Sequence, residues 1–132
     1  MTQLRIAEVA RLLRVSDDTV RRWIDAGRLV AVDGVAGRKV VAGAELARFV
    51  RAQRDDENAA DWPVSARNRF EGIVTDVQRD GLVAQVEVQA GPFRIVSLMT
   101  REAVDELGLE AGSLATAIVK STSVIVQTTP PA

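Results

Sequence analysis

The chain has 132 residues, of which 47% are hydrophobic and 27% are charged, so it can bury the core of one or two small soluble domains. It contains no cysteine and no histidine, which excludes disulfides, thiol chemistry, the usual zinc sites and the most common general base. The net charge of −1 conceals an asymmetry: residues 1–54 hold eleven Arg or Lys against six Asp or Glu, a net of +5, whereas residues 63–132 hold six against eight, a net of −2. The basic part has the sign needed to approach a polyanion.

A short acidic run separates the two parts of the chain. Residues 55–62 carry four acids and no base and show no apolar period, and the residue before Pro63 is pushed out of helical geometry. We therefore predict one domain over residues 1–54, a linker over 55–63 and a second domain over 64–132. The N-terminus lacks the apolar region of a signal peptide, and no window approaches the roughly 18 apolar residues of a membrane helix, so we expect a cytoplasmic protein that binds no membrane.

Apolar residues of the first domain recur at helical spacing. The predicted helices carry these stripes: Ile6, Val9, Ala10 and Leu13; Val20, Trp23 and Ile24; Ala44, Leu46, Ala47, Phe49 and Val50. Ser16 is the expected start of the second helix and Gly27 its end. Two β-like runs, 29–32 and 39–41, flank a hairpin signal between the second and third helices. Trp23 lies on an apolar stripe, which predicts a place in the core.

The second domain changes to a period of two. Strands are expected at residues 70–77, 82–88, 93–99, 115–119 and 124–126, with one short helix that begins at Thr100 and closes at Gly108. Five strands and one short helix in so few residues predict a small barrel. The expected fold class is α+β with two domains, a small helix-turn-helix unit followed by a five-stranded β-barrel.

The first domain has the layout of a DNA reader. Only Arg14-Val15-Ser16 joins its first two helices, and the second helix exposes polar residues between its buried ones. A helix N-terminus that enters the major groove supplies base contacts, while nearby arginines neutralise phosphates. A solvated arginine face, or a helix-turn-helix that serves protein contacts, would show the same spacing.

Three segments carry a family resemblance: residues 6–13 (IAEVARLL), 15–23 (VSDDTVRRW) and 27–29 (GRL). Over residues 3–52 the chain resembles the MerR/excisionase type of winged helix-turn-helix. The resemblance implies double-stranded DNA as a partner. It implies recognition-helix contacts from Ser16, Thr19, Arg21 and Arg22, and wing contacts from Arg38 and Lys39. The helical pattern stops near Gln53, so the long dimerisation helix of MerR regulators is missing and dimerisation must arise elsewhere.

Two polar segments of the second domain have the composition of an anion site. They are residues 65–68 (SARN) and 120–123 (KSTS). A tetrahedral dianion needs several N–H or hydroxyl donors and one or two cations, and these segments supply hydroxyls, turn amides, Arg67 and Lys120. Donors without metal ligands suit a preformed oxyanion better than a metal cation, so no metal-ion site is expected. Ordinary surface turns often have the same composition.

The same segments, with residues 72–77, 100–109 and 117–124, resemble the molbindin (Mop/TOBE) domain, an oligonucleotide/oligosaccharide-binding-like (OB-like) barrel that binds molybdate or tungstate. The resemblance implies ligand contacts from Ser65, Ala66, Arg67, Asn68, Lys120, Ser121 and Thr122. Thr100 matches a position that reaches a site on a neighbouring subunit, although it is equally suited to cap a helix. Ala103 stands where the family often has Ser, so only its backbone N–H would contribute.

The family places its oxyanions between subunits, which implies a homo-oligomer, either a dimer or a hexamer, formed through the β-domain. Burying a dianion is costly unless donors converge from several sides, and one small barrel offers few. Together the two resemblances predict a molybdate- or tungstate-binding DNA-binding protein, a transcription regulator of molybdenum homeostasis. The alternative is a cytoplasmic molybdate storage or buffering protein whose first domain serves assembly or a protein partner. No carboxylate pair or nucleophile–base spacing predicts an enzyme.

Overall fold

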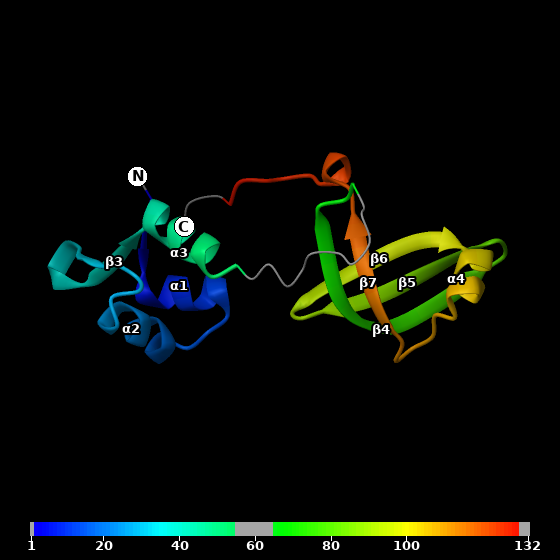
Figure 1. Ribbon diagram of the computed structural model, residues 1–132, viewed down its shortest axis with the longest axis horizontal. Coiled ribbons are helices and arrows are strands. Elements are labelled where there is room, and N and C mark those ends of the chain that lie inside the picture. Colours follow the sequence, from blue (N-terminus) through cyan, green and yellow to red (C-terminus); the bar gives the residue numbers. More distant parts are fainter. Residues whose placement is uncertain (1, 55–64, 130–132) are drawn as a thin grey trace. The chain divides into compact units, whose positions relative to one another are not determined.

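A computed structural model describes residues 2–54 and 65–129 (Figure 1). The chain divides into two compact units, Met1–Glu57 and Asn58–Ala132. The predicted linker, residues 55–63, lies outside the described residues. Within the described ranges, no helix is long and apolar enough to cross a membrane.

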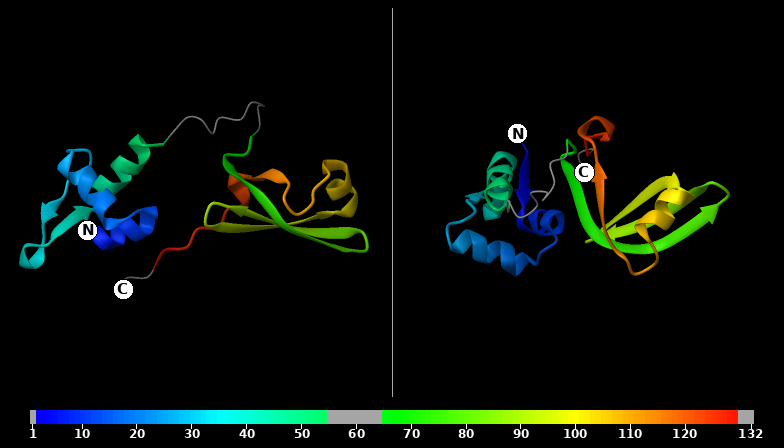
Figure 2. Two further views of the ribbon diagram at one scale, coloured as in Figure 1. Left: turned by 90° about the horizontal axis from the view of Figure 1, so that it is seen from below. Right: turned by 45° about the vertical axis from the view of Figure 1, so that its right-hand side comes forward.

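The first unit combines three helices with a small antiparallel sheet of order β1-β3-β2 (Figures 1 and 2). Its elements are β1 (Gln3–Arg5), α1 (Ile6–Leu13), α2 (Asp17–Asp25), β2 (Val32–Asp33), a 3-10 turn at Val35–Gly37, β3 (Lys39–Ala42) and α3 (Gly43–Ala52). The three predicted helices are confirmed. Strand β1 was not predicted, and the strand expected at 29–32 is reduced to Val32–Asp33 because Leu29 turns into the core, where it is 1% exposed.

The core of the first unit joins all three helices to the sheet. Its buried residues are Val9, Ala10, Val20, Leu29, Val41, Leu46 and Phe49. Trp23 is half-buried and packs against this cluster, with its ring centroid 4.9 Å from that of Phe49. The first two apolar stripes therefore point into this core, and Trp23 packs against it as expected. In the third stripe only Leu46 and Phe49 are buried, whereas Ala44, Ala47 and Val50 are exposed, and Leu29 and Val41 join the core from outside the stripes.

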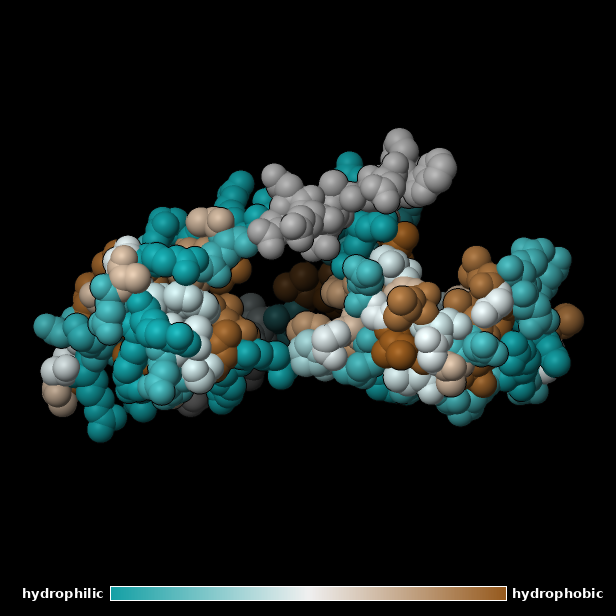
Figure 3. All heavy atoms as spheres, turned by 60° about the horizontal axis from the view of Figure 1, so that its bottom comes forward, coloured by the Kyte–Doolittle hydropathy of each residue, from teal (hydrophilic) through white to brown (hydrophobic). Residues whose placement is uncertain are grey.

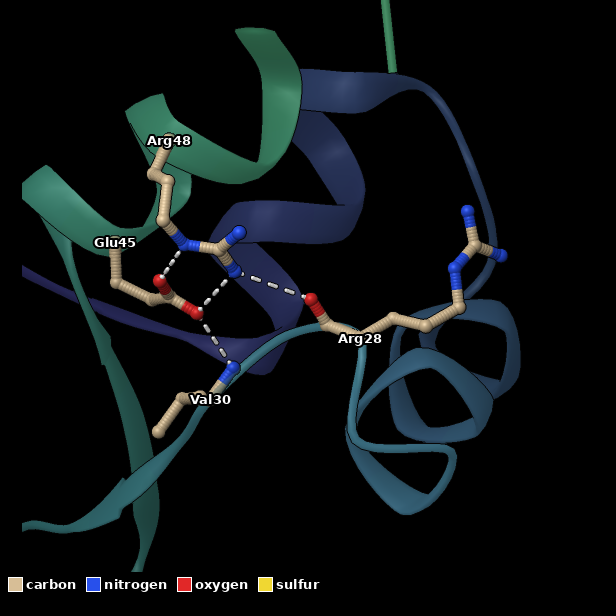
Figure 4. Close-up of polar contacts among 4 residues, drawn as sticks. All are labelled: Arg28, Val30, Glu45 and Arg48. Atoms are coloured by element: carbon tan, nitrogen blue, oxygen red, sulfur yellow. Dashed lines mark hydrogen bonds and ion pairs between the residues drawn. The ribbon is translucent and has the colours of Figure 1, made fainter. Parts of the chain in front are cut away.

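Glu45 of α3 ties that helix to the segment that follows α2 (Figure 4). Its Oε2 accepts from the Val30 N–H at 2.7 Å and from Arg48 Nη2 at 3.0 Å, and the same Arg48 nitrogen donates to the Arg28 carbonyl at 3.2 Å. Hydrogen bonds from the Arg48 guanidinium and from the Val30 N–H lower the pKa of Glu45 from 4.5 to about 2. The carboxylate thus stays charged while it holds residues 28–30 against α3.

The second unit is one antiparallel sheet of order β6-β5-β4-β7 with a short helix. Its elements are β4 (Asn68–Asp80), β5 (Val83–Ala90), β6 (Phe93–Thr100), α4 (Arg101–Leu107), β7 (Leu114–Val119) and a 3-10 turn at Ser121–Ser123. Val74, Ala84, Val86, Val88 and Val104 form its buried core. Four of the five predicted strands and the helix are confirmed.

The prediction of a fifth strand is wrong for the single chain. Residues 124–126, which we call the apolar tail, form no strand in the described structure, and their exposed fractions are 46%, 95% and 86%. The 3-10 turn at Ser121–Ser123 interrupts the chain after β7, so the tail does not continue along its own sheet. Over residues 65–129 the second unit is consequently an open four-stranded sheet and not a five-stranded barrel.

The lowered pKa of Glu45 predicts a pH dependence of stability. A carboxyl with a depressed folded-state pKa contributes stability above its unfolded value, and this contribution is lost as the pH falls from about 4.5 toward 2. Glu45→Gln should lower the melting temperature of the first unit at neutral pH and flatten its dependence on pH in that window. Scanning calorimetry of the full chain measures both effects. Asp25→Asn, at an exposed acid of the same unit, is the control, and an unchanged pH profile in Glu45→Gln would contradict the assignment.

Candidate oxyanion site and nucleic-acid interface

The register between β4 and β7 brings the two polar segments together. Asn68, the first residue of β4, lies opposite Val119, the last residue of β7. Because the strands are antiparallel, the next residues outward, Arg67 and Lys120, flank the same end of the pair. The Asn68 side-chain N–H donates to the Val119 carbonyl at 3.0 Å and fastens this junction. The start of β4 and the turn after β7 lie side by side in Figures 1 and 2.

Each strand contributes one turn to this end, the β4 turn (residues 65–68) and the β7 turn (residues 120–123). In the β4 turn, Ala66 and Asn68 are half-buried, and the exposed Arg67 donates from Nη1 to the Ser65 carbonyl at 3.2 Å. In the β7 turn, Lys120 occupies the position before the 3-10 turn, in which Ser121 and Thr122 are exposed. Two cations, several hydroxyls and turn amides therefore share one rim, which is the donor set that a tetrahedral dianion needs.

Thr100 and Ala103 do not join this rim within one chain. Thr100 lies opposite Val83, which in turn lies opposite Asp80, the last residue of β4. Thr100 and Ala103 thus lie near the Asp80 end of β4, and Asn68 is at the opposite end of that 13-residue strand. The Thr100 hydroxyl accepts from the Ala103 N–H at 3.1 Å, which confirms its role as the N-cap of α4. A contact with a neighbouring copy stays a prediction.

Gly72 allows β4 to reach both of its neighbours. The strand pairs with β7 over Asn68–Ile73 and begins to pair with β5 at Ile73. A Cβ at Gly72 would lie 2.2 Å from the Gln89 carbonyl oxygen, a backbone atom that cannot move aside. Only glycine permits this approach to β5, which occurs within the segment of β4 that pairs with β7.

Three of the predicted DNA contacts form a hydrogen-bonded row on α2. Ser16 caps the helix and accepts from the Thr19 N–H at 3.1 Å, the Ser16 and Thr19 hydroxyl oxygens are 2.9 Å apart, and Arg22 Nη2 donates to the Thr19 hydroxyl at 3.1 Å. Residues three apart share one side of a helix, so this α2 row is a single polar stripe. Its side chains are pre-oriented before any ligand arrives.

The other predicted contacts gather at a separate place, a cleft of about 440 Å³. This basic cleft is lined by Arg5, Ile6, Ala7, Asp17, Arg21, Arg38 and Lys39. Arg21 also faces Asp18, with 3.9 Å between Nη1 and Oδ1, an exposed pair of little strength. Sequence reasoning missed Arg5 because it did not predict β1, and a cation directly before the first apolar stripe was the one available signal.

Comparison with known proteins places both halves of the chain. Residues 64–126 match the family model of the TOBE domain, and residues 4–54 match that of a helix-turn-helix domain. Over 64 residues the chain is 38% identical to Molybdenum-pterin-binding protein 2 of Clostridium pasteurianum, covering 48% of this chain and 94% of that protein. The chain belongs to the TOBE domain family. The matched segment includes the β4 turn, the β7 turn and the apolar tail.

One further relative and one solved structure are similar to about half of the chain. The Molybdenum transport protein ModE of Herbaspirillum seropedicae is 40% identical over 65 residues, which cover 48% of this chain and 24% of that protein. The solved structure of a molybdate-binding protein from Sporomusa ovata is 27% identical, with a TM-score of 0.49, and covers 51% of this chain and all of that one. The helix-turn-helix match does not distinguish the narrower MerR/excisionase type or its winged form, which stay predictions.

The close approach at Gly72 supports a mutational prediction. Gly72→Ala should destabilise the TOBE domain by roughly 1–3 kcal/mol, because the added methyl group overpacks against the backbone of β5. Glu71→Ala, at the exposed neighbouring position, should change stability by less than about 0.5 kcal/mol. Scanning calorimetry of the full chain gives both values. Equal stability of Gly72→Ala and the wild type would show that β4 does not pass so close to β5.

Proposed function

We propose that the protein is a transcription regulator of molybdenum homeostasis that binds molybdate or tungstate in its TOBE domain and double-stranded DNA through its helix-turn-helix. The observation that carries the proposal is the convergence of the β4 and β7 turns in a TOBE domain whose relatives are named for molybdenum. The presence of this TOBE domain on one chain with a helix-turn-helix domain supports the role of a regulator. We propose that the protein is located in the cytoplasm and that it has no catalytic role.

The proposed oxyanion lies on the rim formed by the two turns. Arg67 and Lys120 offset its double charge, while hydroxyls of Ser65, Ser121 and Thr122 and the amides near Ala66 and Asn68 donate to its four oxygens. The rim is exposed to half-exposed in the single chain. Hydrogen bonds to an anion are strengthened when water is excluded, so a second wall is needed to close the site.

A second copy of the chain is the proposed source of that wall. Among the described residues, β6 and β7 are the two outer strands of the sheet, and an apolar groove of about 540 Å³ lies between them, lined in part by Val86, Val88 and Ile95. Figure 3 shows apolar side chains gathered on the surface of this unit. Exposed strand edges and apolar patches of this kind mark sites of association.

We propose that the apolar tail of a second copy fills this groove. It has the β-branched, apolar sequence of a buried strand, but its own sheet leaves it exposed. Pairing of the tail with the open edge of a second copy would complete a five-stranded barrel in each. We further propose that Thr100 and Ala103 of one copy contact the other copy's rim in this assembly. A dimer is sufficient for a palindromic operator, and a hexamer would satisfy the same contacts.

The DNA-binding half of the proposal rests on α2 and the β2–β3 hairpin. The α2 row presents the Ser16 and Thr19 hydroxyls at the start of the helix and the Arg22 guanidinium in its last turn. Arg38 and Lys39 line the basic cleft together with Arg21. We propose that α2 enters the major groove and that the hairpin serves as the wing of a MerR/excisionase-type domain. Bound oxyanion would then act by changing the stability or geometry of the dimer and hence the spacing of the two helix-turn-helix units.

One observation favours the storage alternative. The Clostridium pasteurianum relative is matched over 94% of its length by the TOBE half of this chain alone. Oxyanion binding is therefore expected to be separable from DNA binding. If the protein stores molybdate, the first domain would serve assembly or contact a protein partner.

Calorimetric titration with molybdate, tungstate and sulfate tests the oxyanion site. Arg67→Ala and Lys120→Ala should each weaken molybdate binding about 10- to 100-fold, because each removes a charge-assisted hydrogen bond. Arg94→Ala removes a cation that is paired with Glu87 elsewhere on the sheet and should leave the affinity unchanged. Unaltered affinity in both site variants would place the ligand somewhere else.

DNA affinity at fixed salt, with and without molybdate, tests the regulator. We expect molybdate to change the affinity for a duplex selected from a random pool at least about fivefold, a typical coupling between two sites. The sign depends on which dimer geometry the ligand stabilises. Arg21→Ala with Arg22→Ala should abolish DNA binding and spare molybdate binding. Absence of salt-sensitive affinity of the wild type for any duplex would favour the storage protein.

A further inference from the structure

The predicted DNA contacts divide into two groups with different surroundings. The side chains of the α2 row hydrogen-bond to one another: the Thr19 hydroxyl pairs with the Ser16 hydroxyl and accepts from Arg22. Arg21 lies on another side of the helix and lines the basic cleft. Groups on different sides of one helix meet different parts of a duplex, so we expect them to have different tasks.

The basic cleft concentrates positive charge from three segments that are distant in sequence. Arg5 comes from β1, Arg21 from α2, and Arg38 and Lys39 from the start of β3, whereas Asp17 is the one acid among the lining residues. Four cations and one acid give the cleft a net charge of +3. Like charges in one cleft repel one another, and among residues 2–54 the ion pair that offsets this repulsion is the weak one between Arg21 and Asp18. An anion in the cleft would relieve this repulsion.

We propose that the basic cleft binds a backbone phosphate of the DNA duplex and that Arg5 is one of its ligands. The proposal rests on the proposed DNA-binding function and adds a site and a residue to it. The cleft borders both α2 and the hairpin, the two elements proposed to contact DNA. We therefore expect the anion to be a phosphodiester group of the duplex. Phosphate contacts fix the register of the protein on the duplex but carry no sequence information. The α2 row, with donors and acceptors held in place, is left for base edges.

The division predicts different defects for the two groups. Loss of a phosphate ligand should weaken binding to every duplex alike and should reduce the dependence of affinity on salt, because one fewer counterion is released. Loss of a base contact should weaken binding to the preferred duplex more than to others. Asp17 opposes an anion in the cleft, so its neutralisation should strengthen binding to all duplexes.

The test uses the full chain and two labelled duplexes, one selected by the wild type from a random pool and one of scrambled sequence, in fluorescence anisotropy over a salt series. Arg5→Ala should lower the affinity for both duplexes about fivefold and reduce the slope of log affinity against log salt by about one. Arg5→Lys should retain the slope, and Asp17→Asn should raise both affinities. Arg54→Ala, an exposed cation that does not line the cleft, is the charge-matched control and should change neither.

The outcomes separate this inference from the proposed function. If the wild type binds no duplex, the proposed function fails and the phosphate site with it. If the wild type binds but Arg5→Ala has wild-type affinity and slope, only the phosphate site is wrong. A loss confined to the selected duplex would make Arg5 a base contact and would also overturn the proposal. Titration with inorganic phosphate distinguishes a site for the free ion from a contact with DNA. If phosphate binding depends on Arg5 but duplex affinity does not, the cleft binds the free ion and the proposed contact with DNA is wrong. Circular dichroism of each variant shows whether it is folded.

Discussion

The antiparallel pairing of β4 with β7 is the constraint on which the proposed ligand site depends. The two polar turns are separated by some 50 residues of sequence, and neither has enough donors to hold a dianion alone. The pairing of Asn68 with Val119, fastened by an amide hydrogen bond, places one turn beside the other. Gly72, within the paired segment, lets β4 pass close to β5 at the same point, because any side chain there would collide with the backbone of β5. The strand register therefore determines which hydrogen-bond donors and cations meet on the rim.

The open side of the same sheet explains why the protein is proposed to act as an oligomer. A four-stranded sheet with two outer edges, an apolar groove and an exposed apolar tail leaves much hydrophobic surface in water. Association through this side would bury that surface and enclose the oxyanion rim in one event. Ligand binding and assembly would then be linked, and the helix-turn-helix units would respond to the ligand through the arrangement of the chains.

Local patterns predicted the elements well, and their failures have physical causes. Helical stripes located the three helices of the first unit, and alternation located four strands of the second, because both patterns report burial within one chain. The tail has a strand-like sequence, but a strand needs a neighbour, and the 3-10 turn at Ser121–Ser123 keeps the tail from its own sheet. Arg5 was missed since its strand has only three residues. The proximity of Arg67 and Lys120 was expected only from family resemblance, because register is a long-range property.

The most direct test of the central claim is a crystal structure of the full chain grown with tungstate, whose tungsten atom is located by its anomalous scattering. The account predicts tungsten between the β4 and β7 turns, with oxygens in hydrogen-bond distance of Arg67 and Lys120 and with a second copy closing the site. Tungsten bound away from both turns, or both turns empty in a fully occupied crystal, would contradict it.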